Sequence, residues 1–206
     1  MIYCQARESV YPQMSPATGP GPRERLLDAT RRLTYDKGVG IGMDALLSEA
    51  DVARRSLYQH FGGKDGLVAE TLRTTRTADL ERYRAILDSA GDDPRERLLA
   101  LFDFFTQDTG NRGFRGCRYT AADLALPDPA HPAHAETSQY YEHINELLLK
   151  ELQALGHPEA QQAADQIQLV IDGALIERAT RPGARPAAAA ARLLRHLVDD
   201  WRQGPN

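Results

Sequence analysis

Apolar residues recur at intervals of three and four along almost the whole chain, which is the period of amphipathic helices. No alternating strand pattern competes with it. Glycine, proline and aspartate breaks divide the pattern into about nine helices. The expected segments include residues 23–37, 64–89, 94–109, 132–156, 157–180 and 186–204. The sequence therefore predicts an all-α protein.

Two short helices meeting at a corner are expected between Met43 and Lys64. The first has a stripe formed by Met43, Leu46, Leu47 and Ala50, and a second stripe, out of phase with it, is formed by Val52, Leu57 and Phe61. Asp51 interrupts the two, and aspartate enters the left-handed region more easily than most residues. The outward side of the second helix carries hydrogen-bond donors and no acidic residue: Arg54, Arg55, Ser56, Gln59 and His60, with Tyr58 between them. Such a face suits a polyanion.

These residues resemble a known family. The run S-L-Y-Q-H-F followed by G-G-K-D-G-L is similar to the DNA-binding domain of TetR-type transcriptional repressors, whose signature ends T-L-Y-x-H-F-x-x-K-x-x-L. The matching positions are Ser56, Leu57, Tyr58, His60, Phe61, Lys64 and Leu67. The resemblance implies a three-helix, helix-turn-helix DNA-binding domain over residues 23–70 and a helical regulatory and dimerisation domain over residues 71–206. Residues 1–22, rich in proline and glycine without either period, are expected to be a disordered tail.

The second short helix is expected to enter the major groove of DNA, where Arg54 and Arg55 reach guanine edges or phosphates. Ser56 and Gln59 are also within reach of bases. The resemblance implies that Tyr58, His60 and Lys64 clamp the DNA backbone. Gly42 and Met43, at the start of the preceding helix, complete the expected DNA-binding set. The alternative is that the two arginines are a solvated pair and that Tyr58 belongs to the core.

The charge distribution is consistent with the predicted DNA-binding domain. The net charge is −4, but residues 23–77 hold 10 basic against 8 acidic side chains, whereas residues 78–206 hold 14 against 20. A DNA-reading head on an acidic body agrees with this asymmetry. No apolar run approaches the roughly 20 residues that span a bilayer, and no export signal is expected. Only Cys4 and Cys117 are present, so we expect no disulfide framework and a cytoplasmic protein. Met14 is a candidate for the natural start.

A small-molecule pocket is expected in the regulatory domain. Its candidate residues are Phe102, Phe105, Cys117, Tyr119, Tyr140, Tyr141, His143, Ile171 and Leu175. The segment R-G-C, which ends at Cys117, resembles a motif that opens a short helix in one branch of the TetR-type regulators. Cys117 is either a small packing residue, a ligand-lining residue or an oxidation sensor.

Some of the same residues also have the chemistry of a metal site or of an enzyme. Cys117 with His131, His134 and His143 has the chemistry of metal ligands, but Pro129 and Pro132 make the histidine segment a loop, and no metal or cofactor is expected. An enzyme with Cys117 as nucleophile and His134 or His143 as base would need a third group and an oxyanion site that the spacing does not supply. A helical binding module that does not bind DNA is a further alternative.

The last two helices are expected to form a homodimer contact. Their apolar stripes consist of Ile167, Val170, Ile171, Ala174 and Leu175, and of Ala190, Leu194, Leu197, Val198 and Trp201. Gly173 and Ala174 permit close helix approach. A symmetric dimer would place two recognition helices in successive major grooves, about 34 Å apart on a palindrome. The sequence thus predicts a ligand-responsive, sequence-specific transcriptional repressor that a small-molecule effector releases from double-stranded DNA.

Overall fold

The computed structural model describes residues 19–107, 113–181 and 184–199, and this part of the chain forms nine helices and no strand. The bounds are α1 Pro22–Lys37, α2 Met43–Ala50, α3 Arg54–Phe61, α4 Lys64–Ser89, α5 Pro94–Thr106, α6 Arg118–Ala125, α7 Ala133–Ala154, α8 Ala160–Thr180 and α9 Ala184–Asp199. The expected all-α fold is confirmed. Cys4, Met14 and Trp201 lie outside the described residues, as does most of the expected tail.

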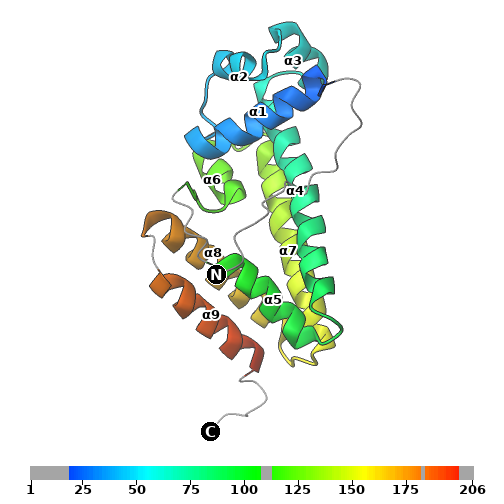
Figure 1. Cartoon of the computed structure of the whole chain (residues 1–206), viewed down its shortest axis with the longest axis vertical. Coiled ribbons are helices and arrows are strands. Elements are labelled where there is room, and N and C mark those ends of the chain that lie inside the picture. The colour runs from blue at the N-terminus through cyan, green and yellow to red at the C-terminus, as the bar shows by residue number, and fades with distance from the viewer. Residues whose placement is uncertain (1–18, 108–112, 182–183, 200–206) are drawn as a thin grey trace, which may run out of the picture.

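The helices α1, α2 and α3 form a small head at one end of the molecule, packed on the first turns of α4 (Figure 1). The head has a core of its own, formed by Leu26, Ala29, Leu33, Leu46, Ala50, Leu57 and Leu67. The corner between α2 and α3 forms as the sequence predicts, because Asp51 takes the left-handed conformation with φ 48°. Val52 then donates a backbone hydrogen bond of 3.1 Å to the Leu47 carbonyl, which closes the turn.

The 26-residue helix α4 joins this head to the larger body formed by α5–α9. It packs against α1 and α3 at one end and against α5 and α7 at the other. The body core begins within the first turns of α4, because Val68 and Leu72 already belong to it. Head and body therefore share one continuous helix, and α3 packs directly on it.

A second link between head and body runs through Tyr35 of α1. Its hydroxyl accepts a hydrogen bond of 2.9 Å from the backbone N–H of Arg115, and the guanidinium of Arg118 lies 5.3 Å from its ring centroid. Arg118 is the first residue of α6, which packs on α7 in the body. The end of α1 is therefore fastened to the segment that leads into α6.

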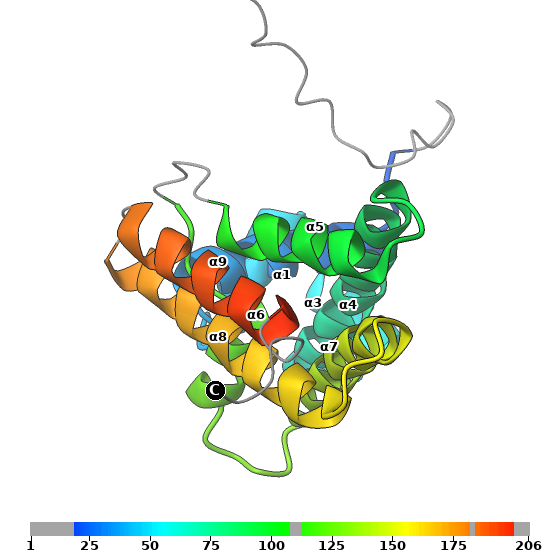
Figure 2. The ribbon, with the colours of Figure 1, turned by 90° about the horizontal axis from the view of Figure 1, so that it is seen from below.

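The helices α8 and α9 lie side by side along one edge of the body (Figure 2). Their predicted stripes point inward: Ile167, Ile171, Ala174, Leu175, Ala190, Leu194 and Val198 are buried, and Val170 and Leu197 are partly buried. The stripes that the sequence assigned to a homodimer contact are therefore covered within the single chain, as in an ordinary core face. The apolar side chains left on the outside are a different set, namely Leu169, Ile176 and Leu193, with 73%, 52% and 53% of their surface exposed.

Asp172 of α8 makes stability depend on pH, because burial raises its pKa from 3.8 to about 6. The unfolded chain holds this carboxyl at the lower pKa, so the folded state binds the proton more tightly. Burial of the charge therefore opposes folding above pH 6, and the penalty disappears as the pH falls towards 4. We expect Asp172→Asn to raise the free energy of unfolding at pH 8 and to have little effect near pH 4. Urea titrations at both pH values measure this, and an equal effect at both would contradict it.

Candidate nucleic-acid interface and body cavity

The outer face of α3 carries a cluster of donors that the body does not cover. Arg54, Arg55, Tyr58, Gln59 and His60 are exposed, and Ser56 is partly buried. Leu57 holds the helix to the head, since it is fully buried beside the partly buried Phe61. No acidic residue occurs within α3. Tyr58 is 51% exposed, so it is available to a ligand and is not a core residue.

One acidic group does approach this surface, and the sequence did not indicate it. The carboxylate of Asp44 in α2 forms an ion pair with the guanidinium of Arg54, and both side chains are exposed. The contact depends on the corner between α2 and α3, which brings residues ten apart in sequence together. Asp44 therefore holds Arg54 in the free protein, whereas no hydrogen bond or ion pair is recorded for Arg55.

The remaining predicted DNA-binding residues surround α3. Gly42 is the N-cap of α2 and Met43 its first residue, and Lys64 begins α4 directly after α3. The N-caps of α2 and α3, Gly42 and Ala53, have no side chain that caps the first backbone amides. Unpaired amides at a helix start bind phosphate well. The head thus presents guanidinium, amide and hydroxyl donors on one side.

A hollow that is lined mainly by aromatic residues lies in the body between α4, α5, α6, α7 and α8 and reaches Tyr35 of α1, with a volume of about 440 Å³. That volume is within the usual range for small-molecule sites. Five of the predicted ligand residues line it: Phe105, Cys117, Tyr119, Tyr140 and Leu175. The other four do not: Phe102 and Ile171 are buried in the body core, Tyr141 packs beside Thr120, and the ring of His143 hydrogen-bonds the Gln139 carbonyl of its own helix.

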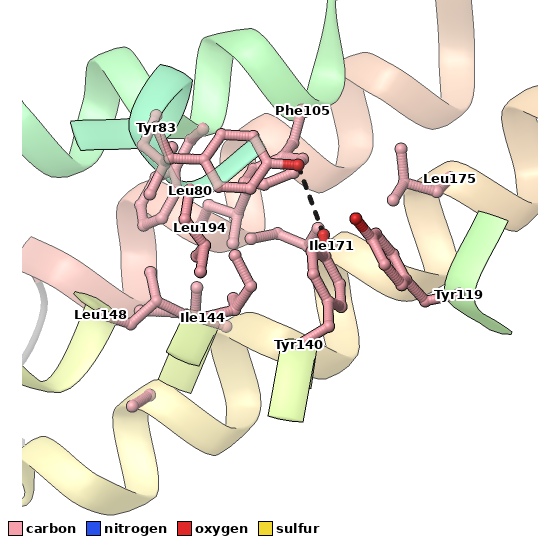
Figure 3. Close-up of a cluster of buried hydrophobic side chains, with 14 of the residues drawn as sticks. Leu80, Tyr83, Phe105, Tyr119, Tyr140, Ile144, Leu148, Ile171, Leu175 and Leu194 are labelled. Carbon is pink, nitrogen blue, oxygen red and sulfur yellow. Dashed lines mark hydrogen bonds between the residues drawn. The ribbon is translucent and has the colours of Figure 1, made fainter. Parts of the chain in front are cut away.

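Tyrosine hydroxyls gather on one wall of this cavity (Figure 3). The hydroxyls of Tyr83 and Tyr140 are 3.4 Å apart, and Tyr119 stacks on Tyr140 with 3.8 Å between ring centroids. Tyr119 donates a hydrogen bond of 2.8 Å to the carboxylate of Asp79. Burial raises the pKa of Asp79 and of all three phenols, so the phenols stay neutral at physiological pH.

Several lining residues were not among those predicted from the sequence: Asp79, Arg82, Phe104, Phe114 and Arg178. Asp79 and Arg82 lie next to the buried Leu80 and Tyr83 of α4, and a charged residue beside an apolar stripe is usually solvated. Phe114 lies in the segment between α5 and α6. Only the tertiary arrangement brings these side chains together.

The histidines considered as metal ligands or catalytic bases are engaged elsewhere. His131 Nε2 lies 3.4 Å from the Asp65 carboxylate, and His134 Nδ1 lies 2.6 Å from that of Asp123. Neither His134 nor His143 lines the cavity with Cys117. Within the described residues, no group of three or more His, Cys, Asp or Glu side chains is arranged to hold a metal ion.

Comparison with known proteins agrees with both parts of the molecule. Residues 26–71 match the model for bacterial regulatory proteins of the tetR family, and residues 124–200 match that of the tetracyclin repressor-like C-terminal domain. A crystal structure described as a tetR transcriptional regulator from Streptomyces avermitilis is 34% identical, with a TM-score of 0.73 over 87% of this chain and 99% of that one.

Two further relatives are similar over most of their length. The crystal structure of SCO4454, a TetR-family transcriptional regulator from Streptomyces coelicolor, is 25% identical, with a TM-score of 0.77 over 87% of this chain and 95% of that one. The HTH-type transcriptional regulator BetI of Stenotrophomonas maltophilia is 27% identical over 87% of this chain and 92% of its own length. In the described part of the chain, no helix has the length and apolarity needed to cross a bilayer.

Proposed function

The chain belongs to the tetR family of bacterial regulatory proteins and is a DNA-binding transcriptional regulator, and we propose that it is a repressor released from a palindromic operator by a small molecule. The observation that carries the proposal is the exposed face of α3, a helix without acidic residues of its own, on a head that shares α4 with a body that contains a cavity. Its relatives are named regulators and not enzymes. As a protein that acts on bacterial DNA, it would work in the cytoplasm.

A homodimer through α8 and α9 is part of this proposal. The exposed residues Leu169 and Ile176 lie seven apart, on one face of α8, and Leu193 is a further exposed apolar residue on the neighbouring α9. Gly173 lies between the first two, is exposed, and a Cβ at this position would meet nothing within 4 Å. Glycine inside a helix is destabilising by about 0.5–1 kcal/mol relative to alanine. Close approach of a second α8 explains why a glycine is useful there.

The release step follows from the links between cavity and head. The cavity is lined by Tyr35 and Arg118, which join α1 to α6, and by Asp79 of α4. A ligand that favours one arrangement of these residues changes the position of α1 and α4, and therefore the distance between the two α3 helices of a dimer. It can shift the equilibrium only by the difference between its affinities for the two states.

The Arg55→Ala substitution is expected to weaken operator binding by about 1–3 kcal/mol if this side chain reads a guanine.

The Asp44→Asn substitution is expected to strengthen operator binding, because it frees Arg54 from its ion pair without removing a donor. The probe is a fluorescently labelled duplex recovered by genomic pull-down with the purified protein, and anisotropy measures its affinity. Arg84→Ala, at an exposed position of α4 in the body, is the matched control and should leave affinity unchanged.

Equal affinity of the parent and Arg55→Ala for this duplex would remove Arg55 from the interface. A uniform loss on operator and unrelated DNA would instead assign Arg55 to phosphate contact. Full operator binding in a chain with both Arg54→Ala and Arg55→Ala would contradict the proposed role of α3.

A further inference from the structure

The body cavity has a chemical character that indicates the kind of molecule it binds. Its apolar walls are mostly aromatic, and several rings contact one another at orientations suited to further stacking. Tyr83 lies 5.6 Å from Phe104 and 5.1 Å from Phe105 between ring centroids, in tilted geometry, and Tyr119 stacks on Tyr140. Flat, rigid walls of this kind favour a planar, unsaturated ligand, because aromatic faces and edges attract each other beyond simple burial.

The charged groups of the cavity are mainly cationic. Among the described residues, three guanidinium groups, those of Arg82, Arg118 and Arg178, line it against one carboxyl group, Asp79. The guanidinium carbon of Arg82 lies 4.5 Å from the centroid of Phe104, and that of Arg178 lies 3.4 Å from the centroid of Phe114. These two arginines are thus held over aromatic rings, and Arg178 also donates a hydrogen bond of 2.8 Å to the Gln107 carbonyl. A guanidinium has five N–H donors, so one such bond does not use all of them.

The carboxyl group of Asp79 does not cancel the positive charge of the three arginines. Asp79 accepts the hydrogen bond of Tyr119, and Arg118 provides an opposing charge that lowers the pKa of Asp79 against the larger effect of burial. A cationic ligand would therefore meet three like charges and one unlike charge. An anion would meet three unlike charges and one like charge, which is a net attraction.

Neutral phenols provide the remaining polarity. The 3.4 Å separation between the hydroxyls of Tyr83 and Tyr140 is longer than an ordinary O–H···O bond of 2.5–3.0 Å, so this pair is weakly satisfied. One of these hydroxyls can turn and donate to an oxygen of a ligand. Arginine edges at one side and a phenol donor at another are complementary to an oxygen-bearing anion.

We propose that this cavity binds a planar aromatic anion, an arene that carries a carboxylate or phenolate oxygen, with its ring among the aromatic walls and its charge beside Arg82 and Arg178. The proposal rests on the repressor function only for the role of this ligand as effector, since binding in the cavity stands by itself. The volume of about 440 Å³ accommodates a fused two-ring arene. An aliphatic anion would lack the stacking contacts, and an aromatic ammonium ion would be repelled.

Three probes separate these contributions when titrated calorimetrically into the full-length protein. We use 2-naphthoate as the aromatic anion, 2-naphthylmethylammonium as the aromatic cation, and cyclohexanecarboxylate as the aliphatic anion. The account expects 2-naphthoate to bind at one site per chain, about tenfold or more tightly than either control, which is the range for one charge-assisted hydrogen bond. Equal or tighter binding of the cation would overturn the assignment.

Variants locate the site. Arg82→Gln and Arg178→Gln should each weaken 2-naphthoate binding by about tenfold through loss of a charged donor. Arg84→Gln, an exposed arginine on the same helix as Arg82 that does not line the cavity, is the matched control and should bind normally. Arg82 is itself exposed, so its variant should fold even if Arg178→Gln does not. Unchanged affinity in Arg82→Gln would contradict the proposed position of the anion.

A separate measurement tells a failure of this proposal from a failure of the repressor function. Operator binding is first measured without probe, and 2-naphthoate is then added at saturation. Operator binding without any calorimetric signal would overturn the ligand class and leave DNA binding intact. A calorimetric signal in a protein that never binds DNA would support the ligand class and contradict the repressor function.

Discussion

A chain in which Leu169 and Ile176 are both replaced by Asp is expected to be monomeric and to bind a palindromic operator about 10²–10⁴-fold more weakly than the parent. Both side chains are more than half exposed in the single chain, so the substitutions should not unfold it. In a dimer, however, the two introduced carboxylates of one chain would be buried against the same two carboxylates of the partner chain. Losing the partner removes the second α3, and with it the advantage of simultaneous binding to two half-sites.

The measurement combines light scattering after size exclusion with anisotropy on the operator. The control introduces the same charge at the same spacing on another face: Ala78→Asp with Ala85→Asp, two exposed positions seven apart on α4, away from α8 and α9. This control should remain dimeric and bind normally. A dimeric Leu169→Asp, Ile176→Asp chain with parental affinity would place the dimer contact elsewhere.

Glu151→Ala is expected to lower the free energy of unfolding by about 1–3 kcal/mol, because it removes a buried carboxylate that accepts charge-assisted hydrogen bonds from Arg97, a partly buried cation that keeps the exposed Asp88 as a second partner. Glu151 of α7 is 4% exposed and accepts two hydrogen bonds from Arg97, at 2.9 and 3.0 Å. Arg97 also donates to the carbonyls of Leu87 and Gly91, at 3.1 and 3.2 Å, and so fastens the turn between α4 and α5. This pair therefore ties three body helices together.

Urea unfolding followed by circular dichroism measures the change, with Glu146→Ala as the control at an exposed position of the same helix. The control should shift the unfolding free energy by no more than about 0.5 kcal/mol, as is usual for surface positions. Replacing both partners, Arg97→Met with Glu151→Leu, should restore much of the stability. A loss in Glu151→Ala as small as that of the control would show that the pair adds little.

Much of the head could be predicted from the sequence because its signals are local. The helical period, the aspartate at the corner and the glycine after Lys37 act within a few residues of chain, and the structure places Asp51 and Gly38 at positive φ as such a reading requires. The outward face of α3 follows from the same reasoning, since Leu57 and Phe61 fix which side is inward.

What could not be predicted depends on contacts between distant segments. Asp44 meets Arg54 only because two helices turn at a given angle, and the cavity joins side chains from six helices and a connecting segment. The proposed dimer face could not be predicted for a different reason. Interior and interface both require apolar residues, so the most regular stripe, with Ile171 and Leu194, proved to be interior, and scattered residues such as Leu169 were left outside.

The most direct test of the central claim is the stoichiometry and affinity of the purified full-length protein on its recovered operator. Sedimentation gives the mass of the protein alone and with DNA, and anisotropy is measured on the palindrome and on an isolated half-site at two salt concentrations. The account predicts a dimer that binds the palindrome far more tightly than the half-site, with affinity falling as salt rises. A strictly monomeric protein, or one that binds no duplex at modest ionic strength, would contradict it.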